Sequence, residues 1–162
     1  MPHPEHVRLA ELVDEGDAEG VLALVSLDEI AACWCEYFAQ LRDEIDRGDV
    51  DTSDEDDPNM WATQFGTWCV SGEMARAFIL ALLASPDAEP FLDTIGAGPF
   101  EDKLDCSDES DLSWIESQAA SNDRFRVALR NMRIDWGVSY DNRVRVYRAA
   151  GIPPERWNKD NP

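Results

Sequence analysis

The spacing best suited to cation chemistry lies between Asp105 and Glu116. Five side chains with oxygen ligands stand there at positions 1, 3, 5, 7 and 12 of an EF-hand-like loop: Asp105, Ser107, Glu109, Asp111 and Glu116. Calcium prefers such ligands, but the sharp turn of that loop normally needs glycine at position 6, where this chain has Ser110. Acids and serines that begin a helix produce the same pattern. Calcium binding by residues 105–116 is therefore an open alternative, and we assign no metal ligand.

Side chains for nucleophilic catalysis are scarce. Such catalysis needs a base within hydrogen-bond reach of a serine or cysteine. The two histidines, His3 and His6, stand near the N-terminus, where we expect a mobile segment. The sequence has no nucleophile elbow, phosphate-binding glycine loop or dinucleotide fingerprint, and it has no zinc pattern. We therefore expect no catalytic residue and no cofactor. A carboxylate pair for acid–base work stays an alternative, because 34 acids guarantee that some pair exists.

The strongest bulk property of the chain is its net charge of −20 over 162 residues. Residues 1–118 carry −24 and residues 119–162 carry +4. A protein this acidic repels nucleic-acid phosphates and anionic lipids, so neither is expected as a partner. A basic protein is the complementary partner. Solubility, a coding bias or adaptation to a salty cytoplasm is the simpler interpretation of the charge.

Three groups of residues are candidates for binding a partner: an acidic segment before Pro58, two acids at the start of a short helix, and one tryptophan with two arginines. These candidates are Asp54, Glu55, Asp56, Asp57, Glu101, Asp102, Trp114, Arg126 and Arg130. The two arginines belong to a basic segment that also holds Arg124 and Arg133. We favour an intramolecular role for this segment, the neutralisation of acidic helices, over an anion or nucleic-acid site. Trp114, Trp136 and Trp157 do not fit the apolar faces of their helices clearly, unlike the other three tryptophans.

The apolar spacing predicts helices along most of the chain. Ser26 and Glu29 form a capping-box pattern that should open a long helix ending near Arg47. Apolar residues from Leu27 to Ile45 follow one face of this helix. Further helices are expected near residues 6–13, 60–69, 72–84, 91–95, 107–120, 122–134 and 139–150, with Ser71, Asn122 and Ser139 as caps. Trp61, Phe65, Trp68 and Cys69 form a predicted buried stripe.

These helices and the near absence of strand patterns predict an all-α fold of about eight helices. We expect an irregular bundle or a stack of short antiparallel helix pairs. One domain over residues 1–162 is expected, with an acidic part (1–58), a helical core (60–150) and a proline-rich tail (151–162). The start lacks the features of a signal peptide, and the longest apolar run has eight residues. A reducing cytoplasm with four free, mostly buried cysteines is the expected setting.

Three stretches resemble an uncharacterised bacterial family of small helical proteins, a domain of unknown function. They are Trp61-x-x-x-Phe65-Gly-Thr-Trp68, Ile95-Gly-Ala-Gly-Pro-Phe-Glu-Asp-Lys-Leu104 and Asn122-Asp-Arg-Phe-Arg-x-Ala-Leu129. The resemblance covers about residues 60–135 and implies an all-α fold without a known activity. Gly96 and Gly98 permit a close approach of helices, and Glu101 and Asp102 suit a helix start. A binding loop is the alternative role of this block.

The leading functional hypothesis is a non-enzymatic, acidic protein-interaction module. Its concrete form is an immunity- or antitoxin-like inhibitor that covers a basic partner, because the charge of residues 1–118 would steer association with a cationic surface. The alternatives are a nucleic-acid mimic, whose carboxylates replace phosphates, and an enzyme or metal-binding protein that uses surface carboxylates.

Overall fold

The structure, a computed structural model, describes residues 4–48, 57–134 and 137–156. These residues are mainly helical and contain no strand, which confirms the predicted all-α fold. Counting the continuous helical runs 60–69 and 89–103 as one helix each, and leaving out the 3₁₀ turn 154–156, they form nine helices. Two compact units divide the chain at residue 88: unit 1 spans Met1–Ala88 and unit 2 spans Glu89–Pro162. The boundaries expected at residues 58 and 150 do not coincide with this division, and the single domain stays a prediction.

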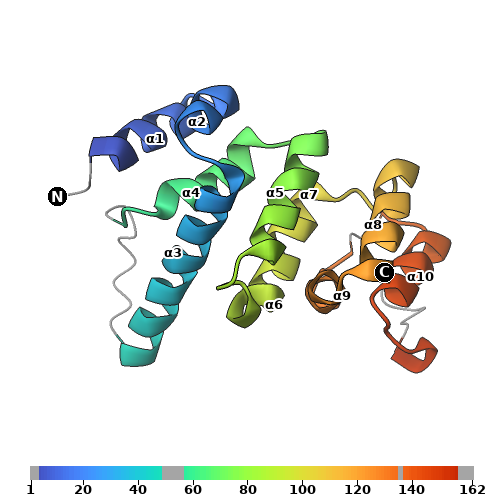
Figure 1. Cartoon of the computed structure of the whole chain (residues 1–162). Helices are drawn as coiled ribbons and strands as arrows, with labels where there is room; N and C mark the ends of the chain where they lie inside the picture. The colour runs from blue at the N-terminus through green and yellow to red at the C-terminus, as the bar shows by residue number, and fades with distance from the viewer. Residues whose placement is uncertain (1–3, 49–56, 135–136, 157–162) are drawn as a thin grey trace. The chain divides into compact units, whose positions relative to one another are not determined.

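Unit 1 consists of short helices around one long one. Its elements are α1 (Pro4–Asp14), α2 (Ala18–Leu24), α3 (Leu27–Arg47), α4 (Met60–Gln64), the π-helical turn η2 (Phe65–Cys69) and α5 (Gly72–Ala84). Helices α3 and α5 lie side by side, and α4 packs on both α1 and α3 (Figure 1). The core of this unit is apolar and includes the fully buried side chains of Ile30, Phe65, Phe78 and Leu82.

The long helix α3 begins and ends as the sequence predicts. The Ser26 hydroxyl accepts a hydrogen bond from the Glu29 amide, and the Glu29 carboxylate accepts one from the Ser26 amide. The Ser26 amide and the Ser26 hydroxyl both donate to the Glu29 carboxylate, and these two hydrogen bonds lower its pKa. Gly48 ends the helix with a φ of 73°, a conformation that glycine adopts without steric cost.

The predicted buried face of α3 is only partly correct. Ile30, Ala31 and Trp34 are buried, but the face opens toward the carboxyl end of the helix, where Ile45 is 54% exposed. Helical spacing identifies one side of the helix, whereas burial also needs a neighbouring element along its whole length. Helices α4 and α5 pack on α3, but among the described residues they do not cover the last turns of α3.

Unit 2 combines short helical turns with three regular helices. Its elements are η3 (Glu89–Phe91), α6 (Leu92–Ile95), the π-helical turn η4 (Gly96–Phe100), α7 (Glu101–Lys103), α8 (Glu109–Ser121), α9 (Asp123–Leu129), α10 (Tyr140–Ala149) and η5 (Pro154–Arg156). Helices α8 and α10 lie side by side, and α6 packs on α9 (Figure 1). The predicted caps Asn122 and Ser139 accept hydrogen bonds from the amides of Phe125 and Asn142. Helix α9 ends at Leu129, five residues before the predicted end.

The glycine-rich block of unit 2 is part of a continuous helical run. Pro99 lies inside η4. Gly96 is buried against α9: a Cβ on Gly96 would lie 2.1 Å from the carbonyl oxygen of Ala128. Gly98 has no atom within 4 Å of its own Cβ position. Close helix approach is therefore confirmed for Gly96 and is wrong for Gly98.

None of the helices in the described ranges has both the length and the apolar character that crossing a membrane requires.

Candidate partner-binding surfaces

Trp68 is the most exposed large apolar side chain among the described residues, at 58%. The sequence predicts a buried position for it, on a stripe with Trp61 and Phe65, which are indeed buried. That prediction assumes α-helical spacing. Residues Phe65–Cys69 form a π-helical turn, whose hydrogen bonds span one residue more than those of an α-helix. The side chains after Phe65 are thereby rotated, and Trp68 points to solvent instead of the core.

The backbone under Trp68 is held firmly. Phe65 and Gly66, which begin the π-helical turn, are buried. The Phe65 ring packs edge-on against Phe78 with centroids 6.0 Å apart, and a Cβ on Gly66 would lie only 2.6 Å from the Phe78 ring. The Thr67 hydroxyl donates a hydrogen bond to the carbonyl oxygen of Thr63 at 3.1 Å. Trp68 is therefore an exposed side chain on a tightly packed base.

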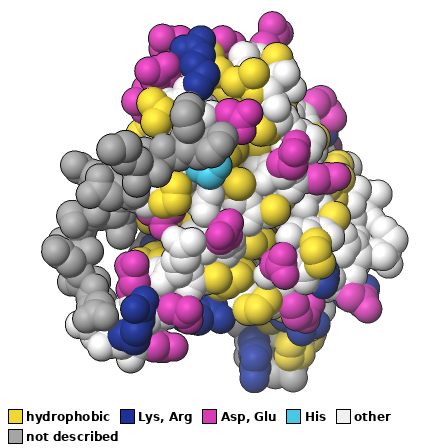
Figure 2. All heavy atoms as spheres, turned by 60° about the vertical axis from the view of Figure 1, so that its left-hand side comes forward, with side chains coloured by type: hydrophobic (Ala, Val, Ile, Leu, Met, Phe, Trp, Pro, Cys, Tyr) yellow, Lys and Arg dark blue, Asp and Glu magenta, His cyan; other side chains and the backbone are white. Residues whose placement is uncertain are grey.

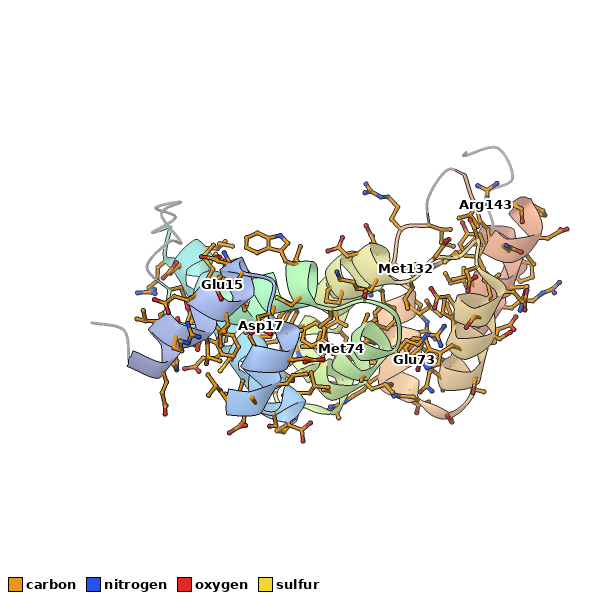
Figure 3. All side chains as sticks on the ribbon, turned by 90° about the horizontal axis from the view of Figure 1, so that it is seen from above. Glu15, Asp17, Glu73, Met74, Met132 and Arg143 are labelled. Atoms are coloured by element: carbon orange, nitrogen blue, oxygen red, sulfur yellow. The ribbon has the colours of Figure 1, made fainter. Side chains whose placement is uncertain are left out.

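The residue after Trp68 contacts the end of α1, where the acidic turn to α2 begins. The Cys69 thiol donates to the carbonyl oxygen of Val13 at 3.6 Å, so the residue after Trp68 contacts the residue before Asp14. Asp14 and Glu15 are both exposed. Asp17, on the same turn, caps α2 by accepting from the Gly20 amide at 2.9 Å; Figure 3 shows Glu15 and Asp17 on this turn. We call Trp68, Asp14 and Glu15 the tryptophan–acid surface.

Most of the negative charge belongs to unit 1. This unit has 20 acids and only four bases, a net charge of −16, whereas unit 2 has 14 acids and ten bases. Acidic side chains are spread between hydrophobic and neutral ones on the face seen in Figure 2, and they form no continuous row there. The arginines of unit 1 cannot neutralise its acids, so its surface keeps a strongly negative field.

In unit 2 an open groove of about 700 Å³ lies between α7 and the segment after α9. Two predicted partner-binding residues, Glu101 and Asp102, line it. Asp102 is exposed, but Glu101 is engaged within the unit: its carboxylate accepts from the Arg133 amide at 2.6 Å and lies 3.7 Å from the Arg133 guanidinium. Buried Leu104 and Cys106 contribute apolar lining. The groove therefore has mixed charge.

The arginines of α9 and its flanks contact their own unit. Arg124 pairs with Glu89 at 3.1 Å. Arg126 pairs with Asp123 and donates to the carbonyl oxygen of Ala119 at 3.1 Å. Arg130 donates to the carbonyl oxygen of Ala150 at 2.8 Å.

The two carbonyls belong to the last turn of α8 and the end of α10, where cations are favoured. These contacts agree with the intramolecular role favoured from the sequence. A second hollow of about 440 Å³ is lined by Arg126, Arg145 and Arg148, together with Glu116. Arg126 and Arg145 are already engaged within the unit.

Arg145 of α10 clamps two carboxylates of α8. Its guanidinium donates to both oxygens of Glu109 at 2.7 and 2.9 Å, and to both oxygens of Glu116 at 2.8 Å. The hydrogen bonds from Arg145 lower the pKa of Glu109 to about 2 and also lower the pKa of Glu116. The same bonds raise the pKa of Arg145.

This clamp bears directly on the calcium alternative for residues 105–116. Positions 5 to 12 of the supposed loop belong to helix α8, not to a loop. Glu116, at position 12, is held by Arg145, and Asp111 accepts a hydrogen bond from the Asp105 amide at 2.8 Å. No group of three His, Cys, Asp or Glu side chains in the described ranges has an arrangement that could hold a metal ion. The spacing reflects helix capping and an ion pair, so the EF-hand geometry is not formed.

The remaining sequence candidates lie in several places. Asp57 is half-buried and accepts a hydrogen bond from the Asn59 amide at 2.7 Å. Asp54, Glu55 and Asp56 lie outside the described residues, as do Trp136 and Trp157. Trp114 is half-buried and packs edge-on against Phe125 with centroids 5.3 Å apart. Asp57 belongs to unit 1 and the other described candidates belong to unit 2.

The side chains that could serve as catalytic base and nucleophile, His6 and the cysteines, take part in packing. His6 is part of α1, where its Nδ1 lies 2.8 Å from the carbonyl oxygen of Pro58 and its ring is edge-on to Trp61. The expected mobile position is therefore wrong for His6, while His3 lies outside the described residues. All four cysteines are free, and Cys35 and Cys106 are buried as expected. Burial raises the pKa of the Cys33 thiol, which disfavours its reactive thiolate.

Sequence reasoning missed Trp68 as an exposed side chain. The available signal was Gly66, because a glycine within a helical apolar stripe indicates an irregularity in the helix. The sequence alone does not reveal that this irregularity is a π-helical turn or that Gly66 packs against Phe78 there.

The comparisons with known proteins give one match. A sequence model described as "Family of unknown function (DUF6869)" matches residues 49–150. This match includes both π-helical turns and the stretch of about residues 60–135 on which the sequence resemblance rests. No curated protein and no solved structure matches the chain.

Proposed function

The chain belongs to a family of unknown function (DUF6869), and we propose that it is a non-enzymatic interaction module whose unit 1 binds a basic protein. The observation that carries this proposal is the concentration of charge. Unit 1 has 20 acidic and four basic residues, whereas unit 2 has 14 acidic and ten basic residues. A surface of one sign steers a partner of opposite sign and accelerates association at low salt.

The concrete form of the proposal is an immunity- or antitoxin-like inhibitor that covers a cationic surface of its partner. Two further observations support a binding role over an enzymatic one. The described cysteines and His6 take part in packing, and the best cation-binding spacing is occupied by Arg145. A cytoplasmic location fits a protein with free cysteines.

The test compares two charge variants of the full chain that change the net charge equally. The first neutralises three exposed acids of α3 in unit 1, with Glu36→Gln, Asp43→Asn and Asp46→Asn. The second neutralises three exposed acids of unit 2, with Asp93→Asn, Asp102→Asn and Asp141→Asn. Basic proteins that the wild-type chain captures from a bacterial lysate are first purified. Surface plasmon resonance then measures the association rates of both variants with these proteins.

We expect the unit 1 variant to lower the association rate by about threefold or more at low salt, and the unit 2 variant to change it less. The difference should shrink as salt screens the charges. Equal effects of both variants would mean that only net charge matters, and would contradict unit 1 as the binding surface. The absence of any purified basic protein that binds at low salt would refute the module itself.

The same assay separates the alternative functions. A nucleic-acid mimic should compete with duplex DNA for a DNA-binding protein. It would need an ordered row of carboxylates, and no such row is seen on the face in Figure 2. An enzyme or metal-binding protein that uses surface carboxylates would lose its activity in one charge variant without any change in binding a basic protein.

A further inference from the structure

We propose that the tryptophan–acid surface receives an arginine side chain of the partner, with the guanidinium stacked on the Trp68 indole and paired with Asp14 or Glu15. This inference rests on the proposed function and identifies the group that unit 1 recognises. Its basis is an exposed indole and two exposed carboxylates on elements that touch, since Cys69, the neighbour of Trp68, contacts Val13, the neighbour of Asp14.

The aromatic part of this surface is suited to a cation. A tryptophan face attracts a guanidinium or ammonium group more strongly than other aromatic rings do. The π-helical turn presents the Trp68 indole to solvent, and the buried residues Phe65 and Gly66 fix the backbone that carries it. The backbone that carries Trp68 then loses little flexibility on binding, because the turn is already packed.

The two carboxylates of this surface have no basic side chain paired with them in the described part of unit 1. Within the described part of unit 1, the side chains of Asp14 and Glu15 form no hydrogen bond or ion pair. Asp17 differs, because its carboxylate already caps α2. Two unpaired carboxylates and an exposed indole on neighbouring elements favour a planar cation with several donors, and a guanidinium provides this geometry while an ammonium does not.

Three probe peptides of ten residues test the chemistry of the ligand. One carries two arginines, one carries two lysines, and one carries two citrullines, which are neutral and close in shape to arginine. Fluorescence anisotropy at low salt with wild-type full chain should rank their affinities arginine first, lysine second and citrulline last. If citrulline binds as well as arginine, charge recognition at this surface is refuted.

Matched variants then test the residues. Trp68→Ala should weaken binding of the arginine peptide by about threefold to thirtyfold, the range of cation–π contributions. Trp68→Leu should weaken binding of the arginine peptide as much as Trp68→Ala does. The affinity of Trp68→Phe should lie between those of wild type and Trp68→Ala. Ile45→Ala is the control, because Ile45 is 54% exposed and lies at the carboxyl end of α3, away from the turn between α1 and α2 (Figure 1); it should change affinity less than twofold.

The carboxylates are tested by pairs of substitutions of equal charge. Asp14→Asn with Glu15→Gln should weaken the arginine peptide more than Asp43→Asn with Asp46→Asn, which removes the same charge from the far end of α3. Circular dichroism checks that each variant keeps its helical content, which is expected because all the substituted residues are exposed.

The results distinguish this inference from the proposed function. If purified basic proteins and the arginine peptide bind but Trp68→Leu retains full affinity, or both acid pairs act equally, the inference is wrong and the proposed function stands. If neither the proteins nor the peptide bind wild-type chain at low salt, the proposed function fails as well.

Discussion

The close contact at Gly96 gives the sharpest test of what the glycine-rich block does. We predict that Gly96→Ala destabilises the protein and that Gly98→Ala, two residues later in the same π-helical turn, does not. The two substitutions add the same methyl group to the same element. They differ in surroundings: a Cβ at Gly96 meets the Ala128 carbonyl oxygen at 2.1 Å, whereas a Cβ at Gly98 meets no atom within 4 Å.

The magnitude follows from the size of the overlap. Ordinary contact begins at 3.4 Å, so the new Cβ is more than 1 Å too close to the backbone of α9. A backbone carbonyl cannot rotate away as a side chain can, and α6 and α9 must separate. Overpacking of this kind costs roughly 3 kcal/mol, the upper part of the usual range. The separation also loosens the stack of Phe100 on Phe125, whose centroids lie 4.8 Å apart.

Both substitutions also gain helix propensity. Replacing glycine with alanine in a helix stabilises by up to about 1 kcal/mol. The net expectation is a loss of roughly 2 kcal/mol for Gly96→Ala, or about 4–8 °C in Tm for a chain of this length. For Gly98→Ala we expect no loss and up to about 1 kcal/mol of stabilisation.

Thermal unfolding followed by circular dichroism and by calorimetry measures both variants. If Gly96→Ala melts at the wild-type temperature or above, the close packing of η4 on α9 is wrong and the block becomes available as a binding loop. A loss of stability in Gly98→Ala equal to that in Gly96→Ala would also contradict the reasoning, because open space surrounds only Gly98.

Two further predictions concern a cap and an ion pair. Ser26→Ala should lower stability by about 1 kcal/mol in urea unfolding, since it removes the capping box of α3. Ser71→Ala, at the start of α5, should be nearly neutral because its side chain makes no capping hydrogen bond. Arg145→Gln should lower Tm at pH 7 more than Arg148→Gln on the same helix. Because Arg145 depresses the pKa of Glu109 from 4.5 to about 2, the stabilisation is present above pH 4.5 and is lost as the pH falls toward 2. The Tm difference between wild type and Arg145→Gln should therefore narrow across that window, and a difference that is constant from pH 6 to pH 2.5 would contradict the clamp.

Local sequence chemistry predicted the helices well. The hydroxyl of Ser26, the carboxylate of Glu29 and the flexible backbone of Gly48 act within a few residues of their own position, so the bounds of α3 follow from the sequence. The caps Asn122 and Ser139 were predictable for the same reason.

The candidate sites were much less predictable. The acids and serines of residues 105–116 share the spacing of a calcium loop, and only the arrival of Arg145 from α10 shows that Glu109 and Glu116 form an ion pair. Trp114 became half-buried because α9 brings Phe125 against it. In both cases the deciding partner comes from another element of the fold.

The sequence by itself determined that this protein is helical, acidic and built on short amphipathic segments, because propensity, capping and apolar period act over one or two turns of chain. The tertiary structure decided which side chains face solvent. Packing of Gly66 against Phe78 accompanies the π-helical turn that exposes Trp68, and packing of Gly96 against α9 closes the glycine-rich block. Those contacts join residues distant in sequence, and a local pattern cannot specify the distance between two helices.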